Sequence, residues 1–343
     1  MPEPRDPIAD LRRIAFLLEA AQEPSYRVRA FRTAAATLAE LGAEQVALIA
    51  ESGGLRELPG IGEVTERTIL ESLRGEEPVY LRRLEATEGT PLAEGAARLR
   101  EALRGDCHAH TEASDGGSSI REMAEAAIEI GHDYLVITDH SSRLTVANGL
   151  SPERLRAQLD EIALLNRELA PFRILTGIEV DINEDGSLDQ EPDLLSRLDV
   201  VVGSVHSALR SEERAMTVRM VTALANPHLD VLGHCTGRMR TRKRNRPPSA
   251  FDADIVFAAA ARFDKAIEVN SRPERLDPPK RLLRLAVEAG CRVAIDTDAH
   301  APGQLAWLGN GCERAFLCGV IPPMIVNAMG VDGLLAWTAA HEA

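Results

Sequence analysis

The sequence predicts an α/β fold in which strands and helices alternate, preceded by a small all-α domain. From residue 105 onward, short apolar runs alternate with amphipathic helical patterns seven times. Residues 1–85 show helical periodicity alone. Six of the nine histidines stand at the ends of the apolar runs. Seven strand–helix repeats predict parallel pairing, either as a barrel or as a doubly wound sheet.

The composition describes a large acidic chain without a secretory pattern. A length of 343 residues suggests two or three domains. The net charge of −14 argues against a broad electrostatic grip on nucleic acid, although a local basic patch stays possible. The five cysteines are scattered and lack a CxxC pair. Because the sequence shows no signal peptide and no apolar run long enough for a membrane span, we expect a reduced, cytoplasmic protein.

Residues 7–41 predict two helices. Ile8, Leu11, Ile14 and Leu18 recur at helical spacing, and Pro24 separates them from a second amphipathic run over 26–41. A glycine turn follows, Leu58-Pro-Gly-Ile-Gly62, and then a helix to residue 73. Glycines two apart at a helix N-terminus can leave backbone N–H groups free for a phosphate. The alternative is a plain turn with glycine caps.

Residues 6–85 resemble the N-terminal domain of family X DNA polymerases. The similarity lies in Tyr26-Arg-Val-Arg-Ala-Phe-Arg-Thr-Ala-Ala35 and in the glycine turn, which would be a helix-hairpin-helix. The resemblance implies a DNA-binding module with Gly60 and Gly62 at the nucleic acid. Thr68 occupies the position of the lysine that forms the Schiff base in lyase-active relatives, and residues 1–85 contain no lysine. Without an amine nucleophile we expect no lyase activity.

Three segments follow from this pattern: a helix-hairpin-helix domain at 1–85, a linker at 86–104 and the strand–helix domain at 105–343. In bacterial family X polymerases, the fingers and palm would stand between the two domains. The residues available there are too few, because a domain needs roughly 50 or more. We therefore expect no polymerase activity.

The strand–helix domain has seven candidate strands, at 105–109, 134–138, 174–180, 199–204, 230–233, 266–269 and 292–296. Helical patterns fill most gaps, as at 120–130, 152–169 and 278–289. If the sheet closes into a barrel, residues at the strand C-terminal ends are expected to be functional.

Coordinating side chains follow these strand ends. In an extended strand, residues i and i+2 face the same side, so His108 and His110 can reach one ion. A single histidine of this kind is as often a core residue as a ligand. The whole set is harder to explain without a metal, and imidazole with carboxylate suits Zn, Mn or Fe. Its members are His108, His110, Asp115, His140, Glu179, His206, His234, Asp298 and His300.

Residues 105–335 resemble the PHP (polymerase and histidinol phosphatase) family, most closely the PHP domain attached to bacterial family X polymerases. The motifs stand in family order: Asp106-Cys-His-Ala-His110, Thr138-Asp-His140, Gly177-Ile-Glu179, Gly203-Ser-Val-His-Ser207, Gly233-His-Cys-Thr-Gly-Arg238, Glu268-Val-Asn270 and Asp298-Ala-His300. The resemblance implies a distorted (β/α)7 barrel with three divalent metal ions.

The resemblance also distributes the ligands. The first ion would be held by His108, His110, Glu179 and Asp298. Glu179 would bridge to a second ion and act as a catalytic carboxylate. The second ion would take His206 and His234 as its other ligands, and the third would take Asp115, His140 and His300.

Further residues are expected to support this site. Asp139 is expected to orient a neighbouring histidine, with a strand-end cap as the alternative. Asn270 is expected to hydrogen-bond the substrate. Cys107 and Cys235 lie beside ligands but face away from them in a strand, so both are expected to be core residues.

The one basic cluster runs from Thr236 to Arg246. Arg238 is expected to clamp a phosphate, with Arg275 as a second candidate. Arg240 and Arg242 are expected to contact nucleic acid, although a charge run is often only a solvated surface.

The chemistry expected is metal-assisted hydrolysis of a phosphoester by a metal-activated hydroxide. The helix-hairpin-helix domain favours DNA as the partner, at a 3′ end or gap, and hence a 3′–5′ exonuclease, 3′-phosphatase or phosphodiesterase. The alternative is a small-molecule phosphatase of the histidinol-phosphatase type. A third possibility is a DNA-binding accessory protein with a structural barrel, which the complete ligand set disfavours.

Overall fold

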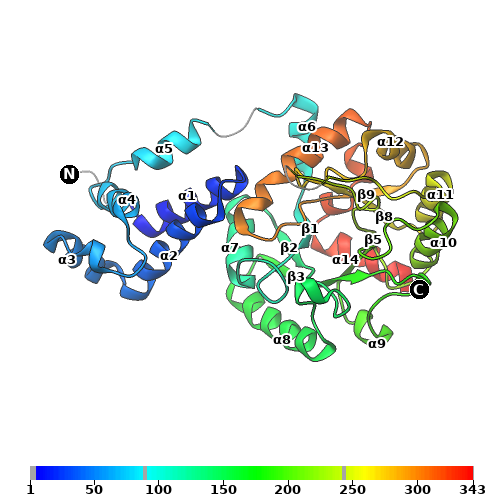
Figure 1. Cartoon of the computed structure of the whole chain (residues 1–343), viewed down its shortest axis with the longest axis horizontal. Helices are drawn as coiled ribbons and strands as arrows, with labels where there is room; N and C mark the ends of the chain where they lie inside the picture. The colour runs from blue at the N-terminus through cyan, green and yellow to red at the C-terminus, as the bar shows by residue number, and fades with distance from the viewer. Residues whose placement is uncertain (1–4, 88–90, 242–244, 343) are drawn as a thin grey trace. The chain divides into compact units, whose positions relative to one another are not determined.

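The computed structural model describes residues 5–87, 91–241 and 245–342. The chain forms two compact units, residues 1–91 and 92–343, each with its own core. Figure 1 shows a helical unit and a larger unit built of strands and helices. Within the described residues, no helix is both long enough and apolar enough to cross a bilayer.

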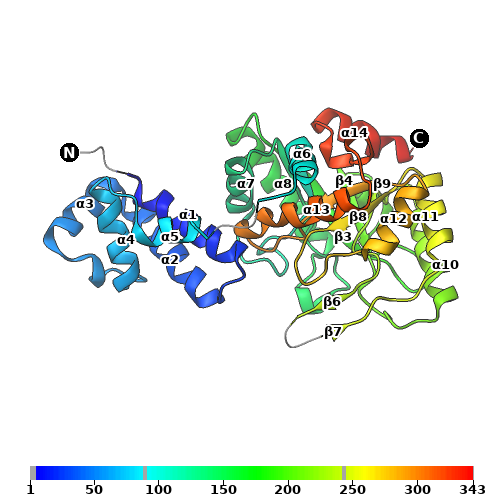
Figure 2. The same ribbon diagram turned by 90° about the horizontal axis from the view of Figure 1, so that it is seen from above.

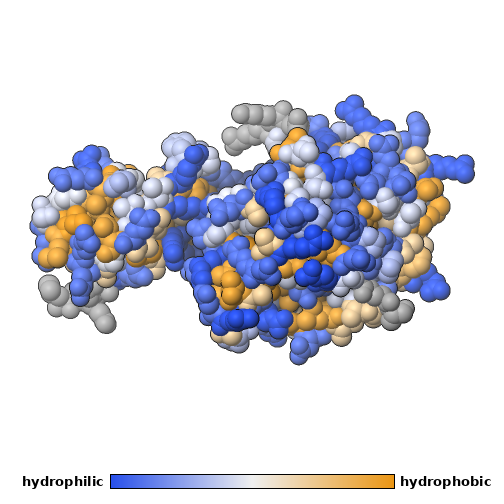
Figure 3. Space-filling view, turned by 90° about the horizontal axis from the view of Figure 1, so that it is seen from below, coloured by the Kyte–Doolittle hydropathy of each residue, from blue (hydrophilic) through white to orange (hydrophobic). Residues whose placement is uncertain are grey.

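The described residues of the first unit form the short 3-10 helix η1 (Leu55–Glu57) and five α-helices: α1 (Pro7–Ala20), α2 (Ser25–Leu41), α3 (Ala43–Ser52), α4 (Glu63–Leu73) and α5 (Val79–Glu85). Leu11, Ile14 and Leu18 of α1 are fully buried, as their helical spacing predicts. Leu48 and Val64 are 67% and 47% exposed. Figure 3 shows apolar residues on the face of this unit turned to the viewer. Part of its apolar surface therefore remains uncovered.

The second unit contains a seven-stranded parallel sheet in which neighbours in sequence are neighbours in space. A doubly wound sheet would reverse direction within the strand order, so this order indicates a barrel. All seven predicted strands are confirmed, with boundaries shifted by a few residues at most. They are β1 (Gly105–Ala109), β2 (Tyr134–Ile137), β3 (Arg173–Asp181), β4 (Val200–Ser204), β5 (Val231–Leu232), β8 (Ala266–Asn270) and β9 (Arg292–Asp296).

The barrel closes between β1 and β9 without a regular ladder. A single parallel bridge joins Ala109 to Ala299, beyond the end of β9. Below it, the Asn327 side chain fills the seam: Nδ2 donates to Gly105 O (3.0 Å) and Ile295 O (2.7 Å), and Oδ1 accepts from Ile295 N (3.0 Å). Asn327 thus hydrogen-bonds to the backbone of both β1 and β9, in the position that an eighth strand would occupy.

Helices surround the barrel. They include α7 (Ile120–Glu129), α8 (Pro152–Glu168), α10 (Glu213–Leu224), α11 (Ala253–Arg262), α12 (Lys280–Glu288) and α13 (Leu308–Leu317). Short α9 (Pro192–Leu195) precedes β4. Leu194 and Leu195 of α9 belong to the core cluster that α8, α10, α11 and α12 form against the strands.

The range predicted as a linker contains part of the barrel domain. Residues 94–102 form α6 (Glu94–Ala102), which belongs to the second unit. Ala96, Leu99 and Leu103 are buried in one cluster with Leu308 and Cys312 of α13. The prediction of a linker over 86–104 is therefore wrong for α6, because its apolar positions face a core and not solvent.

The two ends of the barrel are covered differently. The C-terminal helix α14 (Val331–Ala339) places Leu334 and Trp337 against inward-facing strand residues such as Tyr134 and Val200. Trp337 Nε1 donates to Asp264 O (3.1 Å), just before β8, so α14 covers the N-terminal ends of the strands. Figure 2 shows the hairpin β6 (Met239–Arg240) and β7 (Asn245–Arg246) on the opposite side of the barrel from α14.

Candidate metal centre

Glu179, near the end of β3, lies at the middle of a ring of histidines at the strand C-terminal ends. Its side chain is 1% exposed. Oε2 lies 3.5 Å from His108 Nε2, 3.6 Å from His110 Nε2 and 2.8 Å from His140 Nδ1. Three imidazoles from β1 and from the segment after β2 therefore meet at one carboxylate oxygen.

The other carboxylate oxygen of Glu179, Oε1, faces a second pair of histidines. Glu179 Oε1 lies 3.4 Å from His206 Nε2 and 2.9 Å from His234 Nε2. Asp181 stands behind His206: its Oδ1 accepts from His206 N (3.0 Å) and lies 3.5 Å from His206 Nδ1. Glu179 thus joins two groups of histidines, as expected for a bridging carboxylate.

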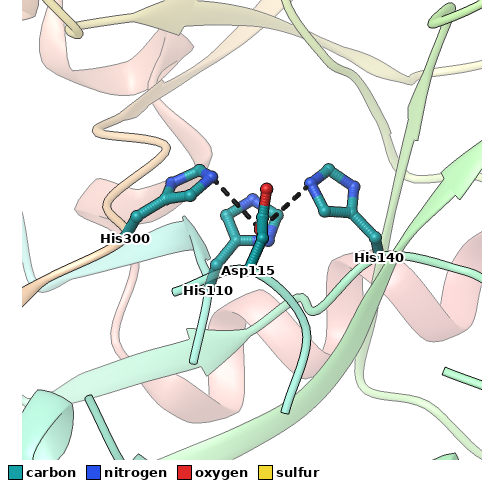
Figure 4. A group of neighbouring side chains, drawn as sticks. All are labelled: His110, Asp115, His140 and His300. Carbon is teal, nitrogen blue, oxygen red and sulfur yellow. Dashed lines mark ion pairs between the residues drawn. The ribbon is translucent and has the colours of Figure 1, made fainter. Parts of the chain in front are cut away.

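A third group surrounds Asp115 in the loop after β1. Asp115 Oδ1 lies 3.5 Å from His140 Nε2 and 3.4 Å from His300 Nε2. Figure 4 shows these two imidazoles on either side of Asp115, with His110 beside it. The ligand atoms of these four residues lie within 4.8 Å of one another, which is close enough to hold one ion.

Asp298 completes the cluster from the segment after β9. Its Oδ1 lies 3.4 Å from His110 Nε2, and its Oδ2 lies 2.9 Å from Arg275 Nε. The backbone of Asp298 has φ +54°, a left-handed conformation that non-glycine residues rarely adopt. Such conformations gather at functional sites, where the surrounding structure holds them.

A shift in the pairing register of β1 accompanies the different surroundings of its neighbouring residues Cys107 and His108. The pairing register of β1 with β2 shifts between Asp106 and Ala109. Cys107 packs in the apolar cluster inside the barrel, whereas the His108 ring reaches Glu179. The predictions that Cys107 and Cys235 are core residues agree with their burial, 0% and 4% exposed.

The donor set fits divalent cations. Among the described residues of this cluster, ring nitrogens of five buried or half-buried histidines and both oxygens of Glu179 lack a hydrogen-bond partner. Buried polar atoms are normally satisfied, so this many in one place calls for a ligand that accepts lone pairs from all of them. A metal ion does so, whereas imidazoles facing each other cannot. The atoms are His108 Nε2, His110 Nδ1 and Nε2, His140 Nδ1, His206 Nδ1 and Nε2, His234 Nδ1, and Glu179 Oε1 and Oε2.

The electrostatics keep the central carboxylate ionised. Burial alone would raise the pKa of Glu179, but His206, His140 and other surrounding imidazoles hold it well below its usual value. Burial, with the neighbouring His300 and His140, lowers the pKa of His110 well below its ordinary value. Against the effect of burial, the charge of Glu179 raises the pKa of His206 to about 9, and Glu268 and Glu179 raise the pKa of His108 well above its ordinary value. A metal ion bound here would therefore displace protons from these two imidazoles.

Two acidic residues outside the predicted ligand set orient its members. Glu268, fully buried in β8, places Oε1 2.6 Å from His108 Nδ1. Asp181 holds the backbone of His206 through the His206 N–H and lies 3.5 Å from the ring Nδ1. A carboxylate behind a ligating histidine fixes the ring and its tautomer. The signal for Glu268 is in the sequence, because it stands two residues before Asn270 in Glu268-Val-Asn270, but its role was not predicted.

Asp139 does not orient a histidine, contrary to expectation. Its carboxylate accepts from Thr111 N (2.8 Å), Thr111 Oγ1 (2.6 Å), Ser114 Oγ (2.5 Å) and Gln158 Nε2 (2.6 Å). These bonds fix the segment that leads to Asp115. The residue therefore shapes the loop of one ligand and does not contact the reacting groups.

Asn270 is also turned inward and not toward a substrate. Its Nδ2 donates to Glu268 Oε2 (3.3 Å) and Asp298 Oδ2 (3.2 Å), and its Oδ1 accepts from Arg272 N (3.1 Å). The side chain is fully buried. In place of the expected contact with substrate, Asn270 links the carboxylates of Glu268 and Asp298 by hydrogen bonds.

Arg238 does not point into the cluster as a phosphate clamp would. Its Nε donates to Arg275 O (2.6 Å) and its Nη2 to Leu276 O. The arginines that reach the cluster are Arg275 and Arg272, whose Nη1 donates to Asp298 O (3.1 Å). The sequence pattern had made Arg275 the second candidate and had not singled out Arg272.

The four residues expected to bind nucleic acid differ in their surroundings. Gly60 has φ +76°, which glycine adopts without strain. Gly62 N already donates to Thr65 Oγ1 (2.9 Å), so this N–H is capped by the following helix and is not free. The Arg240 side chain is exposed on β6, and Arg242 lies outside the described residues.

Comparisons with known proteins agree with this architecture. The family model of the PHP domain matches residues 106–272, and that of a helix-hairpin-helix domain matches residues 4–77. Residues 106–272 therefore form a PHP domain, of the class of metal-dependent phosphoesterases, and residues 4–77 form a helix-hairpin-helix domain.

Among individual proteins, the chain is 46% identical over 240 residues to the DNA polymerase/3′-5′ exonuclease PolX of Bacillus subtilis (strain 168). The match covers 70% of this chain and 42% of that protein, so the chain spans less than half of that relative's length. A probable phosphatase of Thermoanaerobacter sp. (strain X514) is 28% identical over 233 residues, covering 65% of this chain and 89% of that protein.

Among solved structures, histidinol phosphate phosphatase from Lactococcus lactis, complexed with Zn, L-histidinol and phosphate, matches with a TM-score of 0.48 and 18% identity. The match covers 64% of this chain and 95% of that one.

Proposed function

We propose that this protein hydrolyses phosphate esters at the 3′ ends of nucleic acid, as a 3′–5′ exonuclease, 3′-phosphatase or phosphodiesterase. The observation that carries the hydrolytic part is the cluster of unsatisfied imidazole nitrogens around buried Glu179. The helix-hairpin-helix domain supports nucleic acid as the substrate, and so does the similarity to the 3′-5′ exonuclease PolX of Bacillus subtilis.

Nine residues would hold three divalent ions, in the grouping that the family resemblance implies. His108, His110, Glu179 and Asp298 would hold one, Glu179, His206 and His234 a second, and Asp115, His140 and His300 a third. Zinc, manganese and iron all suit this donor set. Bound divalent ions supply a hydrolytic nucleophile near neutral pH and offset the charge that develops on the phosphoryl group.

The chain itself would supply positive charge beside the ions. Arg272 and Arg275 both reach Asp298, and among the described residues Arg272 Nε and Arg275 Nη1 have no hydrogen-bond partner. Guanidinium groups held in this way suit a phosphate, which accepts paired N–H donors. Arg272 also lies over the ring of Trp307 at 5.8 Å, which limits its freedom.

DNA would be held by the N-terminal unit near Gly60 and Gly62, and by Arg240 on β6. Arg242, two residues further in the sequence, is proposed to contribute as well. Neither polymerase nor lyase activity is part of this proposal. The described residues between α5 and β1 form only the nine-residue helix α6. Thr68, in the place of the lysine, is buried and donates to Val64 O (3.0 Å).

The second candidate is a phosphatase for a small phosphate ester. The probable phosphatase of Thermoanaerobacter, matched over 89% of its length, supports it, and so does the net charge of −14. A polyanionic substrate would be repelled by that charge unless it is held locally.

A substrate panel separates the two. The protein loaded with zinc or manganese is given 3′-hydroxyl and 3′-phosphate oligonucleotides and a chromogenic small ester, with His110→Ala as the inactive control. The proposal expects oligonucleotide turnover that collapses when residues 1–91 are removed while turnover of the small ester persists. Hydrolysis of small esters alone would establish the second candidate and contradict the first.

A further inference from the structure

The turn after β8 carries both arginines that reach the metal cluster, and it has an unusual backbone. Leu276 has φ +45°, which a branched aliphatic side chain adopts only when neighbouring contacts hold it. Arg275, one residue earlier, places Nε 2.9 Å from Asp298 Oδ2. The direction of the Arg275 side chain therefore depends on a backbone conformation that needs support.

That support comes from the loop after β5. The Arg238 guanidinium donates to the carbonyls of Arg275 (2.6 Å) and Leu276, the two residues at the strained point. Arg240 N donates to Glu274 O (2.7 Å), one residue earlier. The turn is thus held from outside at three consecutive carbonyls.

Asp277 fixes the same two loops from the other end of the turn. Its carboxylate, fully buried, accepts from Thr236 N (3.1 Å), Thr236 Oγ1 and Arg238 N (3.3 Å). Its own carbonyl accepts from Asn270 N (2.8 Å) at the end of β8. Both the backbone and the guanidinium of Arg238 are therefore held by hydrogen bonds.

We propose that Arg238 is a positioning residue, which holds the Arg272–Leu276 turn so that Arg275 stays paired with Asp298 beside the metal cluster. A planar guanidinium can serve two adjacent carbonyls at once, which the point charge of lysine cannot do. Two of its three nitrogens are engaged in this way and are not free for a phosphate. Arg238 then acts on the reaction through Arg275.

This inference rests on the phosphoesterase part of the proposed function and not on the nucleic-acid part. Misplacing a group at a reacting centre by about 1 Å can cost on the order of 10²-fold in rate. Loss of Arg238 should therefore resemble loss of Arg275, although Arg238 itself does not touch the ions.

The test is a double-mutant cycle in the full chain, using Arg238→Met, Arg275→Met and the double variant. Arg284→Met is the matched control, because Arg284 Nη2 also donates to a backbone carbonyl, Leu317 O (3.3 Å), but on the outer helix α12. The readouts are kcat and KM for a chromogenic phosphate monoester and the visible absorption spectrum of the protein loaded with Co²⁺.

Each single variant at 238 or 275 is expected to lower kcat by tenfold or more, and the double variant to be within about threefold of Arg275→Met. Arg238→Lys should not restore kcat, and the Co²⁺ spectrum of Arg238→Met should shift as that of Arg275→Met does. The Arg284 control should change neither. A merely structural role would lower thermal stability and leave the spectrum unchanged.

Multiplicative losses in the double variant, or a raised KM for Arg238→Met with an unaltered Co²⁺ spectrum, would show direct contact with phosphate and overturn the inference. An unaltered kcat and spectrum would overturn it as well. If the wild-type chain hydrolyses no phosphoester, the proposed function fails, and the spectral cycle still decides whether Arg238 acts through Arg275.

Discussion

At the residue scale, the centre depends most on one carboxylate. Glu179 approaches five imidazoles, and its negative charge is the one that two metal groups would share. Glu179 lies near the end of β3, where it pairs with Val202 of β4 on one side and bridges to His140 on the other, so its backbone has little freedom to move. Removing the charge should therefore affect binding of the ions before it affects the fold.

We expect Glu179→Gln to lower activity by at least 10²-fold and to leave less metal bound after dialysis, because the amide keeps the shape and loses the anionic bridge. Glu184→Gln is the control, since Glu184 is exposed in the turn after β3. Metal content by atomic emission, measured beside activity, checks this. Full metal content in Glu179→Gln would contradict the bridging role.

A buried histidine away from the centre predicts acid sensitivity. Burial, assisted by the positive charge of Arg100, lowers the pKa of His132 to about 3, and neither ring nitrogen has a hydrogen-bond partner among the described residues. An unfolded chain binds a proton at His132 below a pH of about 6.5, whereas the folded chain does not. The free energy of unfolding should therefore fall by about 1.4 kcal/mol per pH unit from pH 6.5 down toward 3 on account of this residue.

Urea unfolding between pH 6.5 and 4.5 measures this slope. His132→Phe removes the titrating group, so its unfolding free energy should vary less steeply with pH than that of the wild type. Parallel curves for the two proteins would mean that His132 keeps an ordinary pKa in the folded state.

At the element scale, the seam between β1 and β9 depends on one side chain. Asn327 satisfies Gly105 O and both backbone groups of Ile295 inside the protein. We expect Asn327→Leu to cost about 3–5 kcal/mol of unfolding free energy, because buried peptide groups lose their partners at roughly 1–3 kcal/mol each.

Chemical denaturation of Asn327→Leu and of Asn310→Leu provides the comparison. Asn310 makes one bond, from Nδ2 to Ser271 O (3.2 Å), and is half-buried, so its loss should cost only about 1 kcal/mol. Equal costs for the two variants would show that the seam has no special importance.

The packing of α6 predicts that the stable barrel domain begins before α6 and not at β1. A chain starting at residue 92 keeps Ala96, Leu99 and Leu103 over α13, whereas a chain starting at residue 105 uncovers that core. Burying a large apolar side chain contributes about 1.5–3 kcal/mol, so the shorter chain should lose roughly 4–6 kcal/mol. Thermal melting of both chains tests this, and equal melting temperatures would contradict it.

The elements and the site were not equally predictable from sequence. Strands in a parallel barrel are buried on both faces, so they read as apolar runs, and all seven were found. The predicted ligands were recognisable because metal chemistry restricts their residue types. The contacts of Asp139 and Arg238 differ from the expected roles for a common reason: both side chains hydrogen-bond to distant segments of the chain. No local sequence pattern shows which segment a side chain will meet. Residues 94–102 were assigned to a helical linker and not to the barrel domain because only Ala96 and Leu99 of α6 are buried against α13.

At the scale of the whole molecule, the proposed function divides hydrolysis and substrate recognition between the two compact units. The predicted ligands stand in or just after six strands of one unit, and the helix-hairpin-helix lies in the other. Loss of the first unit is therefore expected to change which substrates are used without dismantling the cluster.

The place of the closing elements in the chain has a consequence for biogenesis. Asp298 and His300 follow the seventh strand, Asn327 joins the seam later still, and Trp337 of α14 covers the far end of the barrel. A polypeptide emerges from the ribosome N-terminal end first. In the proposed grouping, the first and third ions need Asp298 and His300, whereas Glu179, His206 and His234 of the second ion all precede these residues. We therefore expect the first and third ions to be bound only after the last strand has emerged, late in maturation.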